Sequence, residues 1–265
     1  RIEQPPPARD GMSSACDLLR ARLDALRGRL RIAVIHNGDW REPGAIVNRT
    51  HNPRSDKSYL PVARDIAEGL RNVGFRHVDL VPDDLSLVER LRKGSIHFAW
   101  LNTAGVQGYD SVAHTAGLLE LAGVPYVGHR PLVAVTLDNK HVFKRELVSL
   151  GLPTAPFLVC DASQRGFDPN SDPRFAEAFG SHPGPFVVKP VSGRGSIGVT
   201  FVPDRAALSA AVRGIYASTL NHVQIEPFLP GREFCISVCG RVIARGGDLA
   251  LESEPFAFSA LERVL

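Results

Sequence analysis

The sequence has no long hydrophobic run and no concentrated block of charge. No apolar stretch reaches the roughly 18 residues that a membrane-spanning helix needs. Charged residues make up 22% of the chain, the formal net charge is +3, and the basic residues are spread along it. Such a distribution does not indicate nucleic acid or an acidic membrane surface as a partner. The first ten residues, RIEQPPPARD, do not resemble a signal peptide, so we expect a cytoplasmic protein.

Cysteine is scarce, and two common nucleotide-binding motifs are missing. The four cysteines include Cys235 and Cys239, and no histidines follow them at the spacing of a zinc finger. We therefore expect buried, reduced thiols. The phosphate-binding pattern GxxxxGK[ST] is absent, and no GxGxxG opens a helix after a strand. These absences exclude two familiar ways of binding a nucleotide.

The first half of the chain alternates strand-like and helix-like segments. A helix is predicted over residues 13–29, and short apolar strands are expected at 31–36, 77–81, 96–101 and 125–127. The helices expected between them span 58–73, 83–93 and 111–122, with Asp83 and Asp84 at the start of the second. This alternation predicts a parallel sheet with helices on both faces. Because ligands bind beyond the carboxyl ends of such strands, the loops after His36 and Leu101 should line a substrate cleft.

The pattern changes after Gly128. We expect a loop-rich connection over 161–184, and helices at 137–150 and 205–217, the latter capped by Asp204. Strands are expected at 157–160, 186–190, 198–202, 223–228, 233–239 and 242–245. Strands that follow one another with few helices between them favour an antiparallel α+β unit.

The segment FVVKPVSGRGSIGV joins two of these strands through a glycine- and serine-rich loop. Lys189 stands at the end of the first strand, where a cation can face a ligand. Glycines let successive backbone N–H groups point at one anion, and serine hydroxyls add donors. The segment therefore indicates a flap over phosphates. The glycines and serines alone are weak evidence for this, because a hairpin with a flexible Gly-rich turn would show the same pattern.

Four ordered motifs carry a more specific resemblance. The strand–loop–strand pattern VVKP-x4-GSIGV is accompanied by LLELAGVPYVG at 118–128, LDNKHVFKRELVSLGLPTAPF at 137–157 and VQIEPFLPGREFCISVCG at 223–240. Together they resemble the ATP-grasp fold in its D-alanine–D-alanine ligase branch. The resemblance implies a Rossmann-like α/β domain over 31–128 after an N-terminal tail and helix (1–30). It further implies a central ATP-grasp subdomain over 129–226 and the start of a C-terminal subdomain over 227–265.

The resemblance also implies a set of ATP-binding residues. Lys140 and Lys189 match the two lysines that contact ATP phosphates, although Lys140 by itself would be interpreted as a solvated helix lysine. Glu226 matches the glutamate at the adenine edge, Phe228 and Leu229 match residues that cover the base, and Glu233 matches the glutamate that binds the ribose. The loop residues that match are Gly193, Gly195, Ser196, Ile197 and Gly198. A turn at Pro230-Gly231 must separate the two glutamates, because their spacing puts them on opposite faces of one continuous strand.

Three departures from the family pattern concern substrate and metal. Gly195 replaces the first serine of the family's paired serines. The stretch HNGDWREPG replaces a glycine- and serine-rich loop, and Glu42 within it is our candidate for the amine-binding carboxylate. The family's magnesium ligands lie beyond the ribose glutamate, and the chain stops before they could be matched. Acidic residues near its end could contribute oxygen ligands in principle: Asp248, Glu252 and Glu254.

The resemblance predicts an ATP-dependent carboxylate–amine ligase that works through an acylphosphate. Its cofactors would be ATP and Mg²⁺, its partners small-molecule carboxylate and amine substrates, and its assembly a homodimer. Phosphoryl transfer depends mainly on positioning and charge neutralisation, which agrees with lysines and a glycine flap. Two alternatives stay open: an ATP-grasp ligase of another biosynthetic pathway, and a nucleotide-binding protein without ligase activity.

Overall fold

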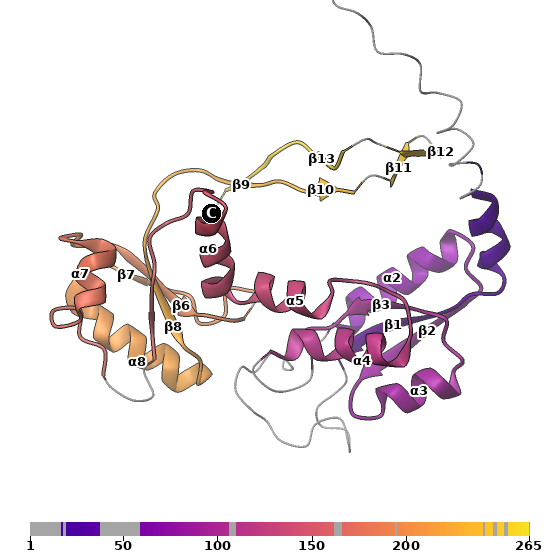
Figure 1. Cartoon of the computed structure of the whole chain (residues 1–265), viewed down its shortest axis with the longest axis horizontal. Helices are drawn as coiled ribbons and strands as arrows, with labels where there is room; N and C mark the ends of the chain where they lie inside the picture. The colour runs from indigo at the N-terminus through magenta and orange to yellow at the C-terminus, as the bar shows by residue number, and fades with distance from the viewer. Residues whose placement is uncertain are drawn as a thin grey trace, which may run out of the picture. The chain divides into compact units, whose positions relative to one another are not determined.

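The computed structural model of the 265-residue chain describes residues 17, 20–37, 59–105, 110–161, 166–193, 195–240, 242–245, 248–251 and 254–264 (Figure 1). Contacts divide the chain into two compact units. The larger comprises Arg31–Val73 and His77–Leu229, and the smaller comprises Arg1–Leu30, Gly74–Arg76 and Pro230–Leu265.

The larger unit begins with a four-stranded parallel sheet, which confirms the predicted strand and helix alternation. The strand order is β2-β1-β3-β4, with β1 at Arg31–Asn37, β2 at His77–Asp83, β3 at Phe98–Asn102 and β4 at Tyr126–Val127. Parallel neighbours require crossover connections. These are supplied by α2 (Leu60–Asn72), α3 (Leu87–Lys93), and η2 (Ser111–Ala113) with α4 (His114–Ala122). The core of β1, residues 32–35, is at most 1% exposed, as expected for a central parallel strand.

Asp83 does not start a helix, contrary to the sequence prediction. It is the last residue of β2 and is 2% exposed, and α3 begins four residues later at Leu87. Its Oδ2 accepts hydrogen bonds from the hydroxyls of Thr103 at 2.7 Å and Thr115 at 2.6 Å. Burial raises the pKa of Asp83 despite these hydrogen bonds. The β2 pairing therefore extends further than the apolar run suggested, because two hydroxyls satisfy the carboxylate at the strand end.

The helix predicted over 137–150 begins later, at Lys140, and a second helix that was not predicted ends just before it. They are α5 (Pro131–Asp138) and α6 (Lys140–Ser149), separated by Asn139 in an extended conformation. The Asn139 side chain accepts a hydrogen bond from the backbone N–H of Val142 at 3.1 Å, so it caps the start of α6. This break makes Lys140 the first residue of a helix.

The second sheet is antiparallel, as predicted, with the order β5-β8-β6-β7. Its strands are β5 (Leu158–Cys160), β6 (Phe186–Pro190), β7 (Thr200–Val202) and β8 (Val223–Pro227). The connection predicted to be loop-rich contains a helix, α7 (Pro173–Phe179), whose first turn is capped by the Asp172 side chain. The predicted cap at Asp204 is confirmed: it accepts from the N–H of Ala207 at the start of η3 (Arg205–Ala207), which leads into α8 (Leu208–Thr219).

One face of this second sheet forms the core with α7 and α8, which lie on that side in Figure 1. Phe175, Phe186 and Leu208 are 0% exposed there. Because side chains alternate along a strand, the neighbouring residues of β6 and β8 must point to the other face. That other face carries Lys189, Gln224 and Glu226 and is the subject of the next section.

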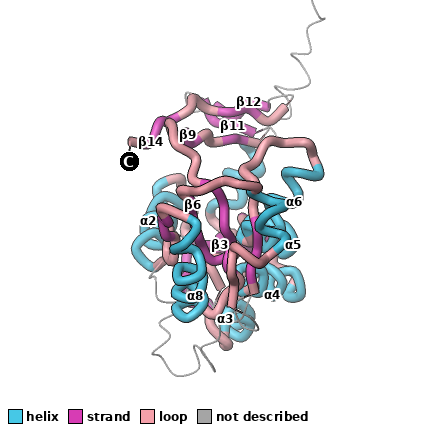
Figure 2. The backbone as a smooth tube through the Cα atoms, turned by 90° about the vertical axis from the view of Figure 1, so that its left-hand side faces the viewer, coloured by secondary structure: helices cyan, strands magenta, loops and turns pink. Residues whose placement is uncertain are grey.

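The smaller unit contains helical residues 20–27 and three two-stranded antiparallel ladders. Figure 2 shows several of its short strands joined by loops. The pairs are β9 (Glu233–Cys235) with β14 (Leu261–Arg263), β10 (Val238–Cys239) with β13 (Phe256–Ala257), and β11 (Val242–Arg245) with β12 (Asp248–Leu251). The predicted strand over 233–239 is thus interrupted.

The cysteine prediction holds only in part. Cys160 is buried, Cys235 is exposed, and Cys239 is partly exposed, and all three are free thiols. Cys235 lies on β9, which pairs with β14 in a two-stranded ladder. Within the described part of the chain, no helix has the length and apolar character that crossing a bilayer requires.

Candidate functional site

The open face of the second sheet brings together polar residues from two neighbouring strands. In the antiparallel register of β6 and β8, Val187 lies opposite Glu226, and Lys189 lies opposite Gln224. Paired residues of antiparallel strands share a face, so all four side chains project away from the α7–α8 core. Helix α6 contributes Lys144 to the same place, where its Nζ contacts Glu226.

Glu226 is held between two lysines. The Nζ of Lys189 lies 2.9 Å from Oε2, and the Nζ of Lys144 lies 3.1 Å from Oε1. The Glu226 side chain is 12% exposed, that of Lys144 10%, and that of Lys189 20%. Burial opposes ionisation of Glu226, but the hydrogen bonds and charges of Lys189 and then Lys144 outweigh it, so its pKa is lowered. The carboxylate is therefore ionised at neutral pH.

Lys144 is the more deeply buried of the two cations. Its pKa is lowered because burial disfavours the ammonium form and outweighs the attraction of Glu226, while Lys189 lowers it further. Its Nζ lies 5.2 Å from the centre of the Phe157 ring, a cation–π distance that helps to fix the side chain. One carboxylate against two ammonium groups leaves the face with a surplus of positive charge.

Gln224 completes the group around Glu226. Its amide Nε2 donates to Glu226 Oε1, and the side chain is 0% exposed. Its own Oε1 is buried and has no hydrogen-bond partner among the described residues. Orientation of the amide donor towards Glu226 thus leaves a buried acceptor unpaired, which is unfavourable for stability.

The glycine loop lies at the end of β6, next to this group. The Nζ of Lys140 donates to the backbone oxygens of Gly193 at 3.0 Å and Val191 at 3.5 Å, and its backbone N–H donates to Val191. Gly193 has φ 131°, a conformation that L side chains rarely adopt. A side chain at Gly198, which has φ 73°, would also come within 3.2 Å of Pro190 Cδ. Lys140 and two required glycines therefore shape the loop.

The tip of the loop is exposed. Gly195, Ser196 and Ile197 are all exposed, and Ile197 is 59% so. Ser196 adopts φ 59°, an uncommon left-handed conformation for a residue other than glycine. Gly195 also has a positive φ, 67°, and the N–H of Val199 donates to the oxygen of Ser196 at 3.2 Å, so the tip is a tight turn. The base of the loop is held by Asn221, whose Nδ2 donates to the hydroxyl of Ser192 at 2.9 Å.

Beyond Glu226 the face becomes apolar. Phe228 and Leu229 are 40% and 68% exposed, as residues that cover a ligand would be. Phe201 on β7 meets Phe228 edge to face, with ring centres 5.3 Å apart. The N–H of Phe228 donates to the oxygen of Pro185, so it is already engaged within the protein.

The structure brings most of the sequence-predicted residues into one region: Lys140, Lys189, Gly193, Gly195, Ser196, Ile197, Gly198, Glu226, Phe228 and Leu229. Glu233 belongs to the smaller unit, where Arg263 Nη1 contacts its Oε1 at 2.6 Å. Gly231, with φ 136°, lies in the predicted turn between the two glutamates. Glu42 lies outside the described residues.

Sequence reasoning missed three members of the group: Lys144, Gln224 and Phe201. Lys144 follows Lys140 by one helical turn, and Gln224 precedes Glu226 by two positions in a strand. Both spacings place side chains on a shared face and could have indicated these residues. Phe201 had no comparable signal, because its neighbour Phe228 follows a different strand, β8, and is distant in the sequence.

No metal centre is formed by the described residues, because they contain no group of three His, Cys, Asp or Glu side chains that could hold an ion. Of the three acidic residues considered from the sequence, Glu254 is exposed, Asp248 begins β12, and Glu252 lies outside the described residues. The described donor set therefore does not fit a magnesium site.

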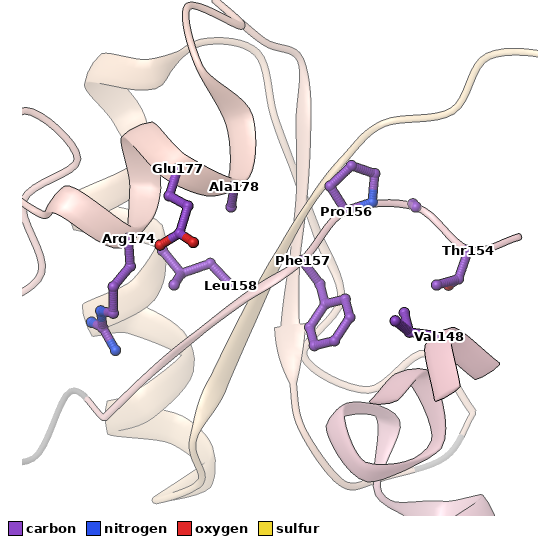
Figure 3. A pocket seen from close by; sticks show the side chains of 9 residues that line it. Val148, Thr154, Pro156, Phe157, Leu158, Arg174, Glu177 and Ala178 are labelled. Atoms are coloured by element: carbon purple, nitrogen blue, oxygen red, sulfur yellow. The ribbon is translucent and has the colours of Figure 1, made fainter. Parts of the chain in front are cut away.

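Two cavities border other parts of the larger unit, and one of them shares Phe157, the ring that lies against Lys144. One of about 490 Å³ is bordered by Asp83 and Asp84, but Thr103, Thr115, Ser86 and Arg90 already engage their carboxylates. The other, of about 460 Å³, is drawn in Figure 3. It has Arg174 and Glu177 of α7 at one end, Val148 and Thr154 at the other, and Phe157 between them. Neither cavity includes a residue predicted to bind ATP.

Comparison with known proteins finds D-alanine–D-alanine ligases. Residues 147–260, which contain the whole second sheet, match the family model described as the D-ala D-ala ligase C-terminus. A D-alanine–D-alanine ligase of Synechococcus sp. is 30% identical over 182 residues, covering 68% of this chain and 53% of that protein. The chain is D-alanine–D-alanine ligase-like. A second such relative, from Streptomyces griseus subsp. griseus, is 36% identical over 173 residues, covering 65% of this chain and 41% of that protein.

This ligase-like chain spans about half the length of the curated relatives that it matches. Among solved structures, the D-alanine–D-alanine ligase from Bacillus anthracis complexed with ATP aligns with a TM-score of 0.58 at 23% identity. The alignment covers 89% of this chain and 70% of that one. The parallel and antiparallel sheets described above are therefore compatible with the ATP-grasp fold of these neighbours.

Proposed function

We propose that the open face of the second sheet binds ATP, and that the protein is an ATP-dependent carboxylate–amine ligase. The observation that carries the proposal is the cationic group around Glu226 beside a glycine loop held by Lys140. Ammonium groups and directed N–H groups neutralise the charge of a polyphosphate. The relationship to D-alanine–D-alanine ligases supports the same assignment.

In this proposal each part of the face has a role. Lys140 and Lys189 contact phosphates, together with the loop residues Gly193, Gly195, Ser196, Ile197 and Gly198. Glu226 accepts a hydrogen bond from the adenine edge, and Phe228 and Leu229 cover the base. Because the Phe228 N–H is engaged by Pro185, we assign the hinge N–H to Leu229. Glu233 would accept from the ribose hydroxyls, and Glu42 is retained as the candidate amine-binding carboxylate.

The proposed reaction has two steps. A substrate carboxylate oxygen attacks the γ-phosphorus of ATP, ADP leaves, and an acylphosphate forms. An amine nitrogen then attacks the acyl carbon and loses its proton, phosphate leaves, and an amide bond results. The lysines and loop position the phosphates and offset their charge, so no side-chain nucleophile is required.

Magnesium ordinarily accompanies ATP in phosphoryl transfer. We propose that Mg²⁺ is required, but the described residues supply no set of ligands for it, and we assign none. The domain organisation that we propose keeps an α/β domain over 31–128, a central subdomain over 129–226 and the start of a further subdomain at 227–265, with residues 1–30 preceding them. A homodimer is also proposed, and light scattering after size-exclusion chromatography would measure it.

The test is ADP release in the presence of Mg²⁺, ATP and pools of amino acids. We expect amino-acid-dependent ADP release that Lys189→Ala abolishes. Lys93→Ala is the matched control, because Lys93 is an exposed lysine paired with Glu89 on α3 and should leave the rate unchanged. ATP binding without any ADP release would contradict the ligase proposal and favour a nucleotide-binding protein without ligase activity.

A further inference from the structure

If the proposed function is correct, Lys189 interacts with two partners, Glu226 and the ATP phosphates. In the structure its Nζ lies 2.9 Å from Glu226 Oε2, yet the proposal also assigns it to the ATP phosphates. It is the more exposed of the two lysines, at 20% against 10%, and it stands at the end of β6 beside the glycine loop. Lys189 is therefore the cation that can turn towards an incoming phosphate.

Lys144 cannot turn in the same way. It projects from α6 rather than from the loop, its side chain is 10% exposed, and its ammonium lies over the Phe157 ring. It contacts the other carboxylate oxygen of Glu226, Oε1, at 3.1 Å, and Gln224 donates to that same oxygen. Two donors thus hold Oε1 independently of Lys189, and Oε2 has Lys189 as its ion-pair partner.

We propose that Lys144 and Gln224 are positioning residues that hold Glu226 ionised and oriented after Lys189 moves to the phosphates, so that Oε2 becomes the acceptor for the 6-amino group of adenine. This inference rests on the proposed function. An ionised carboxylate accepts a hydrogen bond from an amino group and repels a carbonyl oxygen. Lys144 thereby contributes, through Glu226, to the preference of the site for a 6-amino purine over a 6-oxo purine.

The arrangement of Gln224 supports a role beyond packing. Its amide donor faces Glu226 although this leaves its buried Oε1 without a partner among the described residues. The opposite orientation would place the amide oxygen against the Glu226 carboxylate, so the observed orientation keeps a donor on Glu226 Oε1. We assign to Gln224 the function of holding Oε1 of Glu226, so that Oε2 of Glu226 is directed outwards.

The experiment compares ATP with inosine triphosphate, which carries a 6-oxo group, by isothermal titration calorimetry with Mg²⁺ on the full chain. We expect the parent protein to prefer ATP and Lys144→Met to reduce that preference about tenfold, the usual effect of losing a hydrogen bond to a charged group. Lys144→Arg should restore it. Arg145→Met removes an exposed charge from the same helix and should keep the parental preference.

The pH profile separates positioning from a general loss of structure. Without Lys144 the pKa of Glu226 rises, so in Lys144→Met the preference for ATP should fall further as the pH is lowered from 8 to about 5.5. The parental preference should stay flat over that range. If Lys144→Met does not fold, Gln224→Met provides the second variant and should also reduce the preference.

The two proposals fail in different ways. Tight ATP binding with an unchanged ATP preference in Lys144→Met, or in Gln224→Met where Lys144→Met does not fold, would overturn the positioning role and leave the proposed function intact. Absence of ATP binding by the parent protein would overturn both.

Discussion

Replacement of Glu226 by glutamine tests the electrostatic interpretation of the candidate site. The substitution keeps the size of the side chain but leaves Lys144 and Lys189 facing each other without a compensating charge. Removal of one partner of a buried ion pair costs about 3–5 kcal/mol. Because Lys189 is 20% exposed and can be partly hydrated, we expect a loss near the lower end, about 3 kcal/mol at pH 7.

The loss should depend on pH in a defined way. In the variant nothing offsets the burial that lowers the pKa of Lys144, so between that lowered pKa and 10.5 the unfolded chain binds more protons than the folded one. The stability of the variant therefore rises as the pH rises through that window. In the parent protein the lowered pKa of Glu226 increases the free energy of unfolding. This contribution is complete above the ordinary pKa of 4.5, and it is lost as the pH falls through the pKa of the folded state. The difference between the two proteins should be largest near neutrality.

Urea denaturation followed by circular dichroism at about pH 4, 7 and 9.5 measures this difference. Glu146→Gln is the matched control, because Glu146 is an exposed carboxylate on the same helix as Lys144, and its substitution should change stability by less than about 0.5 kcal/mol. A Glu226→Gln loss below about 1 kcal/mol at pH 7, or one that is constant across the three pH values, would refute the reasoning.

Three further predictions concern residues around the site. Phe186→Ala removes a side chain that is 0% exposed in the core beneath the site, and should cost about 3–5 kcal/mol in the free energy of urea unfolding; a loss below about 1 kcal/mol would show that the core is packed differently. Burial raises the pKa of the Cys160 thiol to about 12, so native protein treated with iodoacetamide at pH 8 should be modified at the exposed Cys235 and not at Cys160, as peptide mass spectrometry would reveal. Burial lowers the pKa of His141, and neighbouring cations lower it further, so stability is complete above the ordinary value of 6.5 and is lost as the pH falls through it towards the folded pKa. Thermal unfolding from pH 5 to 8 should show that His141→Phe flattens this dependence, and an unchanged slope would contradict it.

Much of the fold could be predicted from the sequence because hydrophobic periodicity reports directly on burial. The apolar run of β1 and the alternation in β6 placed these strands correctly, and the cap at Asp204 followed from its side chain. The errors arose where tertiary contacts override local pattern. Asp83 ends a strand because two threonines from elsewhere in the chain bind it, and α6 starts three residues later than predicted because Asn139 caps it.

The candidate site was predicted through its motif residues and not through their partners. Lys189 and Glu226 were chosen for separate roles, and the structure shows that they form an ion pair. Lys144 was overlooked because a lysine on a helix is ordinarily solvated, whereas in the assembled fold it is buried against Glu226 and Phe157. Sequence patterns specify which face a side chain occupies within one element, whereas pairing between elements depends on the assembled fold.

Photo-crosslinking with 8-azido-ATP tests the central claim most directly, because it reports where the base binds. We expect labelling, suppressed by excess ATP, of peptides that contain Phe201 or Phe228, and a marked reduction of that labelling in Lys189→Ala. ATP-protected labelling confined to the strands of the parallel sheet, or no ATP-protected labelling at all, would contradict the assignment of the nucleotide site to the open face of the second sheet.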